Sequence, residues 1–309
     1  MELVTLEKLK NKKEKIAVAI GVFDGVHLGH QLVIDNAISY AKSNNVKSMV
    51  ITFDISPKIA LGNVLNDGYL TPTDEKLRIL KEMGINYALV LKFDSTLSNL
   101  SADEFITEYL LKIGVCYVSV GFDFRFGFGG TGSAELLLNH AKFKVEVLDA
   151  VLMDDDKVSS TRIKKLLKMG DLDPVNLMLG RNFSVSGEVV SGNQMGAEIG
   201  FPTANLKLND DYLFPLRGVY HTISQIDNSR FISMTNIGFN PTANMRESIS
   251  IETHIFNFSE NIYGKKLRVE FLHKIRDEIK FSNIDELIAQ LERDRNTACK
   301  LSYKMSINV

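Results

Sequence analysis

Two histidines three residues apart lie in a glycine-rich segment whose composition suits phosphate binding. Residues 21–30 read GVFDGVHLGH and join the apolar run 16–23 to a helical pattern that starts at Leu28. Backbone N–H groups at such a strand-to-helix junction can face an anion, and glycines let the backbone approach it closely. His27 and His30 could then donate hydrogen bonds to one phosphate. An isolated H-x-x-H is more often a turn with two surface histidines, but the glycines and the junction favour the phosphate site.

A second segment carries oxygen atoms that suit a Mg²⁺ ion. Residues 200–205 read GFPTAN, and Pro202 restricts the backbone there. Thr203 and Asn205 are two positions apart, so in an extended chain their side chains point to the same side. Mg²⁺ prefers hard oxygen ligands of this kind. Taken alone, the segment could also be an ordinary turn.

The first segment lies in a region where strand-like and helical patterns alternate. Such alternation predicts β-α-β units and a parallel, Rossmann-like sheet, with ligands at the carboxyl ends of its strands. The predicted strands are 16–23, 47–53, 87–93, 115–120 and 145–152. The predicted helices are 28–43, 74–83, 101–112, 134–141, 160–169 and 175–179.

The pattern changes after Gly180 to period-two segments separated by turn residues, which predicts a small antiparallel barrel. Its predicted strands are 183–190, 219–226, 231–237, 250–258 and 266–273. Asn283, with Glu286 three residues later, predicts the start of a final helix that runs to about Leu301. We therefore expect two domains, residues 1–180 and 181–309.

The bulk composition is that of a globular protein. Of 309 residues, 45% are hydrophobic and 24% are charged. The net charge is −2, and without a basic excess a nucleic-acid partner is disfavoured. No apolar run approaches the ~20 residues of a membrane span. Cys116 and Cys299 lie far apart and fit a reducing compartment. We expect a cytoplasmic protein, a monomer or weak homo-oligomer, with no membrane or nucleic-acid partner.

Three segments of the first region resemble bacterial FAD synthetases, which are nucleotidylyltransferases. Residues 21–30 are similar to the family's G-x-F-D-G-x-H-x-G-H signature. Residues 120–127 read VGFDFRFG and resemble its V-G-x-D-F-R-F-G loop, while residues 158–164 read VSSTRIK and resemble I-S-S-T-x-I-R. The resemblance implies that this region transfers AMP from ATP to FMN, which yields FAD and pyrophosphate.

The same resemblance assigns roles to single residues. It makes His27 and His30 catalytic, and it places Asp123 and Phe124 at the flavin, although one aromatic residue of such a loop is more often part of the core. The ATP-binding residues that it implies are Gly21, Phe23, Asp24, Gly29, Ser160, Thr161 and Lys164. Hydroxyls at a helix start are also ordinary caps. Lys164 stands where the family usually has arginine, so the charge is kept but the bidentate fork is lost.

The second region resembles riboflavin kinases. Residues 200–205 match their G-x-P-T-A-N motif, residues 179–192 resemble the entry strand, and residues 236–242 resemble N-I-G-x-x-P-T. Residues 251–258 are similar to E-x-H-x-F-D-F, and Arg276 and Glu278 match the family's ending. The resemblance implies that ATP phosphorylates riboflavin here.

Glu252 is the general base by this resemblance, taking the proton from the terminal ribityl hydroxyl of riboflavin. A strand glutamate without such surroundings would be expected to face solvent. The resemblance implies ATP contacts from Gly200, Thr203 and Asn205, a Mg²⁺ site at Thr203 and Asn205, and flavin contacts from Arg276 and Glu278. Two residues depart from the family: Ala197 replaces a common arginine, and Asn257 replaces an aspartate.

We therefore expect a bifunctional enzyme in which an α/β Rossmann-like nucleotidylyltransferase domain precedes a small all-β, Greek-key barrel kinase domain with a C-terminal helix. Its ligands would be riboflavin, FMN, FAD and ATP, with Mg²⁺ or another divalent cation accompanying ATP. An enzyme with only the kinase activity, given Lys164, and a flavin-binding regulatory protein are the alternatives. A Rossmann dehydrogenase is disfavoured because no G-x-G-x-x-G follows the first strand, and the similar residues 127–132 follow a late strand.

Overall fold

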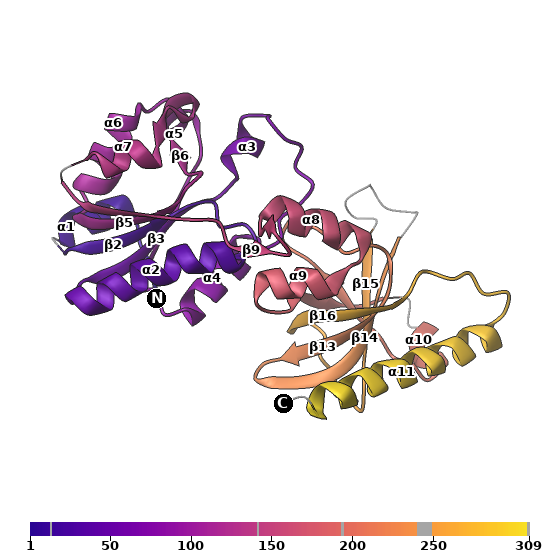
Figure 1. Cartoon of the computed structure of the whole chain (residues 1–309). Helices are drawn as coiled ribbons and strands as arrows, with labels where there is room; N and C mark the ends of the chain where they lie inside the picture. Colours follow the sequence, from indigo (N-terminus) through magenta and orange to yellow (C-terminus); the bar gives the residue numbers. More distant parts are fainter. Residues whose placement is uncertain (13, 141, 193–194, 240–248, 308–309) are drawn as a thin grey trace. The chain divides into compact units, whose positions relative to one another are not determined.

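The computed structural model describes residues 1–12, 14–140, 142–192, 195–239 and 249–307 (Figure 1). It divides into two compact units, Met1–Ser160 and Thr161–Val309. The boundary expected near residue 180 therefore lies downstream of the division that the structure shows. Within the described ranges, no helix has the length and apolarity needed to cross a membrane.

The first unit is built on a parallel sheet of six strands in the order β1-β4-β3-β2-β5-β8. The chain moves outward from β2 through β3 to β4 and then crosses back to β5, so the strand order reverses beside β2. Ligands of such sheets bind at this reversal, beyond the carboxyl ends of the strands. The strands are β1 (Glu2–Leu3), β2 (Ile16–Ile20), β3 (Lys47–Phe53), β4 (Tyr87–Leu91), β5 (Val115–Gly121) and β8 (Lys144–Leu148).

Alternate residues of β2 enter hydrophobic clusters on opposite faces of the sheet, as the pleat of a strand requires. Ile16, Val18 and Ile20 belong to the larger cluster, while Ala19 packs with residues of α2 and α4. The helices of this unit are α1 (Leu6–Lys12), α2 (Leu28–Asn44), α3 (Pro57–Ala60), α4 (Thr73–Glu82), α5 (Ser95–Ser98), α6 (Ala102–Phe105), the π-helix η1 (Ile106–Leu111), the 3₁₀ turn η2 (Phe128–Gly130) and α7 (Ala134–Leu138).

Several predicted boundaries of the first unit were wrong. The predicted strand 145–152 ends at Leu148, and the chain then forms a hairpin of β9 (Leu152–Met153) and β10 (Asp156–Lys157), because Asp154 and Asp155 turn with positive φ. A further short hairpin pairs β6 (Arg125–Phe126) with β7 (Gly132–Ser133). The predicted helix 134–141 ends at Leu138, and Ala141 lies outside the described residues.

The second unit is a closed antiparallel barrel in the order β11-β12-β15-β14-β13-β16. One strand, β12, was missing from the prediction because it is short and overlaps the GFPTAN segment. The strands are β11 (Phe183–Val190), β12 (Ala204–Lys207), β13 (Gly218–Ile226), β14 (Ser229–Phe239), β15 (Ile249–Ile255) and β16 (Lys266–Arg276). The helices are α8 (Ser160–Met169), whose first residue is in the first unit, α9 (Leu172–Leu179), α10 (Met195–Glu198) and α11 (Ile284–Ile307).

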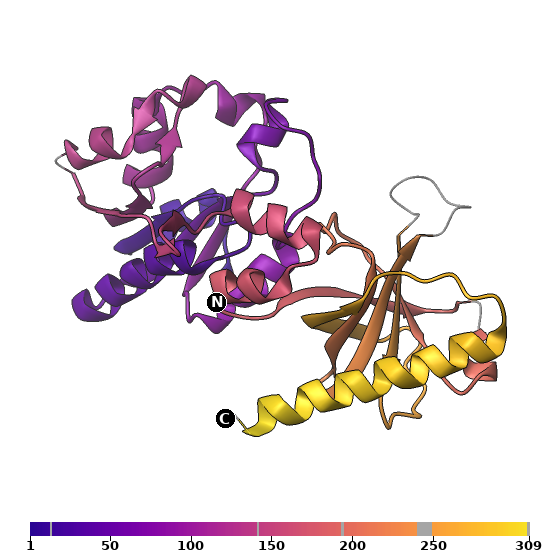
Figure 2. The same ribbon diagram turned by 45° about the vertical axis from the view of Figure 1, so that its right-hand side comes forward.

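Helix α11 runs along one side of the barrel (Figure 2). Its buried Ala298 packs with Val219 of β13 and Met234 of β14. Helix α9 is attached to the barrel elsewhere, through Asn176. The Asn176 side chain donates from Nδ2 to the Phe271 carbonyl at 2.9 Å and accepts the Phe183 N–H at 2.7 Å. These bonds attach α9 to the barrel.

We predict that a fragment of residues 161–309 is more stable than one of residues 181–309. The shorter fragment lacks both Asn176 hydrogen bonds, each contributing about 1 kcal/mol, and it exposes the surface of β11 and β16 that α9 contacts. Circular dichroism should show a melting temperature lower by at least about 5 °C for the shorter fragment. Asn176→Ala in the longer fragment should reproduce part of this loss. Equal melting temperatures for the two fragments would contradict the assignment of α9 to the barrel.

Candidate active sites

Residues 21–30 form the junction between β2 and α2, as predicted from the pattern. His27 is the N-cap of α2, and its Nδ1 accepts the His30 N–H at 3.3 Å. The two imidazole rings stack with their centroids 3.6 Å apart. Because Nδ1 of His27 is an acceptor, the neutral ring carries its proton on Nε2. The structure thus brings both histidines together at the positive end of a 17-residue helix.

The glycines of this junction make room for neighbouring rings. A β-carbon on Gly21 would lie 2.9 Å from the Phe23 ring, and one on Gly29 would lie 3.3 Å from Cε1 of His27. The Phe23 side chain is only 2% exposed and belongs to the core beside α2. Phe23 can therefore contact a nucleotide only through its backbone. The first role of Gly21 and Gly29 is to leave space for the Phe23 and His27 rings.

Asp24 and Ser160 connect the junction to neighbouring segments. Asp24 is 8% exposed, and its Oδ1 accepts the Thr71 N–H at 3.1 Å. The Ser160 hydroxyl donates to the Asp24 carbonyl at 2.8 Å, which places the start of α8 beside this loop. Thr161 and Lys164 follow in α8 but belong to the second unit.

The predicted flavin residues of the first unit lie after β5. Asp123 is exposed and forms an ion pair with Lys157 at 2.5 Å. Phe124 is half-buried and stacks on Phe126 at 5.6 Å between ring centroids. Phe126 in turn lies 5.4 Å from Phe105. Phe105 stacks on Tyr109 at 5.3 Å, so one row of aromatic rings runs from this loop to η1.

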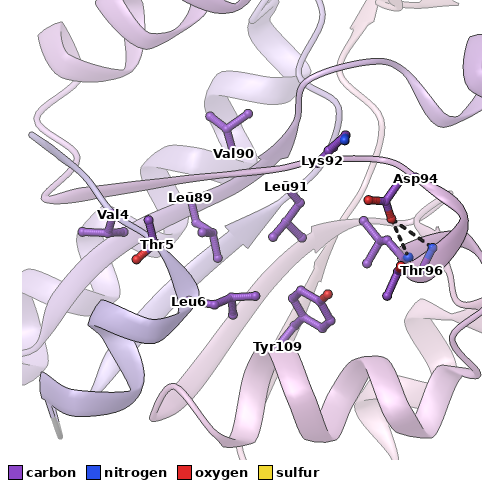
Figure 3. A pocket seen from close by; sticks show the side chains of 11 residues that line it. Val4, Thr5, Leu6, Leu89, Val90, Leu91, Lys92, Asp94, Thr96 and Tyr109 are labelled. Carbon is purple, nitrogen blue, oxygen red and sulfur yellow. Dashed lines mark hydrogen bonds between the residues drawn. The ribbon is translucent and has the colours of Figure 1, made fainter.

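A cavity of about 340 Å³ lies at the other end of this aromatic row (Figure 3). It opens at the carboxyl end of β4, and its lining is polar and apolar in nearly equal parts, with Lys92, Asp94 and Thr96 at one end. Asp94 caps α5 by accepting the Thr96 and Leu97 N–H groups at 3.0 and 3.2 Å. The apolar and aromatic lining comes from Val4, Leu6, Leu89, Leu91, Leu97 and Tyr109. Sequence reasoning missed this cavity, because the segments that line it are far apart in the chain.

In the second unit, the register of the barrel brings Glu252 beside two asparagines. Asn205 of β12 lies directly opposite Glu252 of β15, and Asn236 of β14 lies opposite Glu252 on its other side. Directly opposed residues of antiparallel strands point to the same face, with β-carbons about 4.5–5.5 Å apart. Asn236, which the sequence places only within the 236–242 motif, thus joins the predicted site residues.

Glu252 is half-buried, and this burial raises the pKa of its carboxyl above the ordinary value. Asn205 is held close to Gly192, where a β-carbon would lie 2.2 Å from the Asn205 Nδ2. Gly200 has a φ of +85°, so its first role is to permit the turn before Thr203. Thr203 immediately precedes β12, and Asn205 is the second residue of that strand.

Arg276 and Glu278, the two predicted flavin residues of the second unit, lie at and just after the end of β16. Val219 pairs with both Asn236 and Arg276, which puts Arg276 in the same transverse row as Glu252. The Arg276 guanidinium donates from Nε and Nη2 to Oδ2 of Asp294, at 2.8 Å in each case. Its Nη1 donates to the Asp277 carbonyl at 2.9 Å. Arg276 is therefore already engaged by α11, which sequence reasoning did not foresee.

Glu278 lies close to Asn236. A β-carbon on Gly238 would lie 3.1 Å from Nδ2 of Asn236 and 3.2 Å from Oε1 of Glu278, so glycine leaves the space that both side chains occupy. The last part of the 236–242 motif, residues 240–242, lies outside the described residues. Among the residues that are described, no group of three or more His, Cys, Asp or Glu side chains could hold a metal ion.

Comparison with known proteins assigns both halves. A family model for FAD synthetase matches residues 9–162, and one for riboflavin kinase matches residues 179–302. A bifunctional riboflavin kinase/FMN adenylyltransferase of Listeria monocytogenes is 37% identical over 280 residues, which cover 90% of this chain and 89% of the relative. The Bacillus subtilis protein of the same description is 33% identical over 94% of each chain. This chain belongs to the bifunctional riboflavin kinase/FMN adenylyltransferase family.

A solved structure has the same fold along almost its whole length. It is described as a macrolide-efflux protein from Streptococcus pneumoniae, and it superposes with a TM-score of 0.87 at 31% identity, covering 96% of this chain and 99% of that one. The predicted family and the predicted fold class, a nucleotidylyltransferase-like parallel sheet followed by an antiparallel barrel and a helix, are confirmed.

Two departures from the family pattern have a local explanation in the structure. Asn257 follows β15 with a φ of +54°, a conformation that asparagine and aspartate tolerate better than most residues. Ala197 lies exposed in the four-residue helix α10, where a small side chain disturbs no packing. Nothing in the structure explains why Lys164 replaces arginine.

We predict that His27→Ala or His30→Ala lowers kcat for FAD formation from FMN by about 10²–10³-fold, the usual effect of losing one preorganised donor. FMN should accumulate when riboflavin is the starting substrate, because the kinase domain is unchanged. Kinetics at saturating ATP distinguish this loss from weaker ground-state binding.

His140→Ala is the matched control, because His140 lies in the same unit and stacks on Phe143 away from the junction. It should leave kcat unchanged. An unchanged kcat for His27→Ala and His30→Ala would instead remove both residues from the catalytic site.

Proposed function

We propose that the barrel phosphorylates riboflavin at Glu252 and that the junction between β2 and α2 transfers AMP from ATP to the resulting FMN. The family model for each activity spans the corresponding site. The observation that carries the proposal is the register of the barrel, which sets Asn205, Glu252 and Asn236 side by side. This is the arrangement that a base beside a bound nucleotide needs.

In the kinase reaction, Glu252 accepts the proton of the terminal ribityl hydroxyl while that oxygen attacks the γ-phosphorus of ATP. A new P–O bond forms, and the bond to ADP breaks. The raised pKa of Glu252 makes its carboxylate a stronger base than an exposed glutamate. Asn236 lies beside the base and Glu278 lies close to Asn236, so both are placed to orient the flavin, whereas Arg276 contributes mainly by fixing α11 through Asp294.

The side-chain oxygens of Thr203 and Asn205 fit a Mg²⁺ ion that is shared with the nucleotide. Mg²⁺ usually keeps several waters and takes only one or two protein ligands besides phosphate, so a hydroxyl and an amide suffice. When bound, the ion neutralises charge on the phosphates. The amide of Asn205 is held in place between Gly192 and the neighbouring Glu252.

In the transferase reaction, a phosphate oxygen of FMN attacks the α-phosphorus of ATP, and pyrophosphate leaves with the electrons of the broken P–O bond. No protein nucleophile is needed. His27 and His30, together with the Phe23 backbone, donate to the phosphates as charge develops on the transferred group. The Ser160 hydroxyl and Asp24 keep this loop in place, while the ATP contacts of Thr161 and Lys164 stay predictions.

The cavity at the end of β4 is the proposed site of the flavin ring in this reaction. Its volume, the Tyr109 ring and a lining that is apolar and polar in nearly equal parts suit a planar heterocycle with polar edges. Two strand spacings of about 4.8 Å each separate β4 from β2, a distance that the ribityl chain can span. The aromatic row connects the cavity to the loop that carries Asp123 and Phe124. A cytoplasmic location and a monomeric or weakly associated state stay predictions.

We predict that Glu252→Gln lowers riboflavin phosphorylation by about 10²–10⁴-fold, as expected for loss of a general base. Conversion of added FMN to FAD should continue, and chromatography separates the two. The base form of Glu252 is lost on acidification, so kcat of the wild-type kinase should fall as pH drops through a value above the ordinary glutamate pKa. A variant with near-normal FMN formation, or a wild-type rate that is unchanged on acidification, would contradict this role.

We also predict that Thr96→Trp, which fills the cavity from its rim, raises the KM for FMN in FAD formation by up to about tenfold, because one ring contact contributes about 0.5–1.5 kcal/mol. The KM for ATP should stay within about twofold. Thr107→Trp is the matched control, since Thr107 is exposed on η1 and does not line the cavity. Equal effects of both substitutions would place the flavin ring elsewhere.

A further inference from the structure

A buried ammonium group lies under the nucleotide-binding junction. Lys76 of α4 is only 4% exposed. Its Nζ donates to the Val22 carbonyl at 2.8 Å and to the Thr52 hydroxyl at 3.1 Å. Thr52 in turn donates to the same Val22 carbonyl at 3.0 Å. Lys76 thereby connects the chain after β2 to the end of β3.

A buried lysine is rare and costly, so its partners must compensate for lost hydration. Lys76 makes no direct ion pair with any residue that the structure describes. Asp24 and Asp54 attract it from a greater distance, while its neighbour Glu75 is already paired with Arg78 at 2.8 Å. Burial outweighs this attraction and lowers the pKa of Lys76 to about 8.

The carbonyl that Lys76 holds belongs to the peptide that precedes Phe23. The chain has no cis peptide bond among its described residues, so the Phe23 N–H points away from the Val22 carbonyl and hence away from Lys76. Phe23 itself has a φ of +52°, which a bulky residue adopts only when its surroundings impose it. The hydrogen bond from Lys76 therefore fixes which way this strained peptide faces.

The same segment holds the loop at a second point. Thr71, five residues before Lys76, accepts the Gly25 N–H with its hydroxyl at 2.7 Å and donates its own N–H to Asp24. Thr71 and Lys76 thus contact the loop on both sides of Phe23. His27 and His30 follow directly, so a rotation of the Val22 peptide would displace them too.

We propose that Lys76 is a positioning residue of the adenylyltransferase site, whose charged side chain orients the Val22–Phe23 peptide so that the Phe23 N–H and the two histidines align on the phosphates of ATP. This inference rests on the proposed location of the adenylyl-transfer site. Lys76 exchanges no proton with the substrates. It acts through the backbone and by a positive charge behind the phosphate-binding loop.

Lys76→Met in the full chain tests the role, since methionine keeps the length of the side chain but removes the charge and the donors. We expect kcat for FAD formation from FMN to fall by about 10- to 100-fold, the scale of a displacement of about 1 Å in reacting groups. The KM for FMN should change by less than about threefold. Riboflavin phosphorylation in the same protein should be unaffected. Lys81→Met, on the exposed last turn of α4, should leave both rates unchanged.

The pH profile separates positioning from a purely structural role. The ammonium is present below pH 8 and is lost as pH rises through about 8. The wild-type kcat should therefore fall above pH 8, Lys76→Met should lack that fall, and Lys76→Arg should retain activity to higher pH because arginine stays charged. The folded pKa lies below the unfolded one, so deprotonation of this group from about pH 8 to 10.5 stabilises the fold and does not itself cause unfolding.

A wild-type kcat in Lys76→Met, or an identical alkaline fall in both proteins, would overturn the inference. If Lys76→Met loses the first unit's melting transition, the pH dependence of kcat in Lys76→Arg becomes the test. An alkaline fall in kcat at the same pH as in the wild type would then contradict the role of Lys76. His27→Ala serves as the reference. If it reduces FAD formation while Lys76→Met does not, the site stands and only the role of Lys76 fails. If neither has an effect, the proposed site itself is wrong.

Discussion

Phe23 and Val26 have φ values of +52° and +39°, and the adenylyl-transfer site depends on keeping them there. Non-glycine residues in this region cost of order 1–3 kcal/mol each and persist only where neighbouring groups impose the conformation. Here the neighbours are the bonds from Lys76 and Thr52 to Val22 and the bond from Gln31 to the Val26 carbonyl at 2.8 Å. The buried polar side chains around the loop are thus part of the site, although none is an obvious phosphate ligand.

The kinase site depends on a different constraint, the register of the barrel strands. A slip of one residue would turn Glu252 to the opposite face of β15. Hydroxyl groups on that opposite face resist such a slip. Thr253 bonds to Thr235 at 3.0 Å, Thr235 to Thr222 at 2.9 Å, and Thr222 to Ser233 at 2.8 Å, all of them fully buried. Each slipped register would leave some of these hydroxyls without a partner in a dry interior, at about 1–3 kcal/mol for each group.

The sequence was sufficient to predict features that depend on local pattern. Strand β2, the N-terminal position of His27 on α2 and most of the barrel strands follow from periodicity and from glycine placement. Residues 200–205 were recognised as a site, but their pairing as β12 was missed because four residues carry little periodic signal. The boundary near residue 180 followed the change of period and stays a prediction; the compact units divide at Ser160, and Asn176 attaches α9 to the barrel backbone. Such a tertiary bond leaves no pattern in the sequence.

Side-chain surroundings were the least predictable part. A lysine on an amphipathic helix is ordinarily exposed, so the sequence gives no reason to place Lys76 under the loop. Arg276 matched a family motif, yet its partner Asp294 lies on α11, eighteen residues later in the chain. The cavity at β4 is formed by α1, α5 and η1 together, and only the folded chain brings them into contact.

Burial has opposite consequences for the ionisable groups of the two sites, because it always disfavours the charged form. It raises the pKa of Glu252, which works as a carboxylate, and lowers the pKa of Lys76, which works as an ammonium. On the proposed roles, acid conditions weaken the kinase and alkaline conditions weaken the transferase. Both steps then run together only between these limits. Riboflavin would accumulate on the acid side and FMN on the alkaline side, so the ratio of products reports which buried group has titrated.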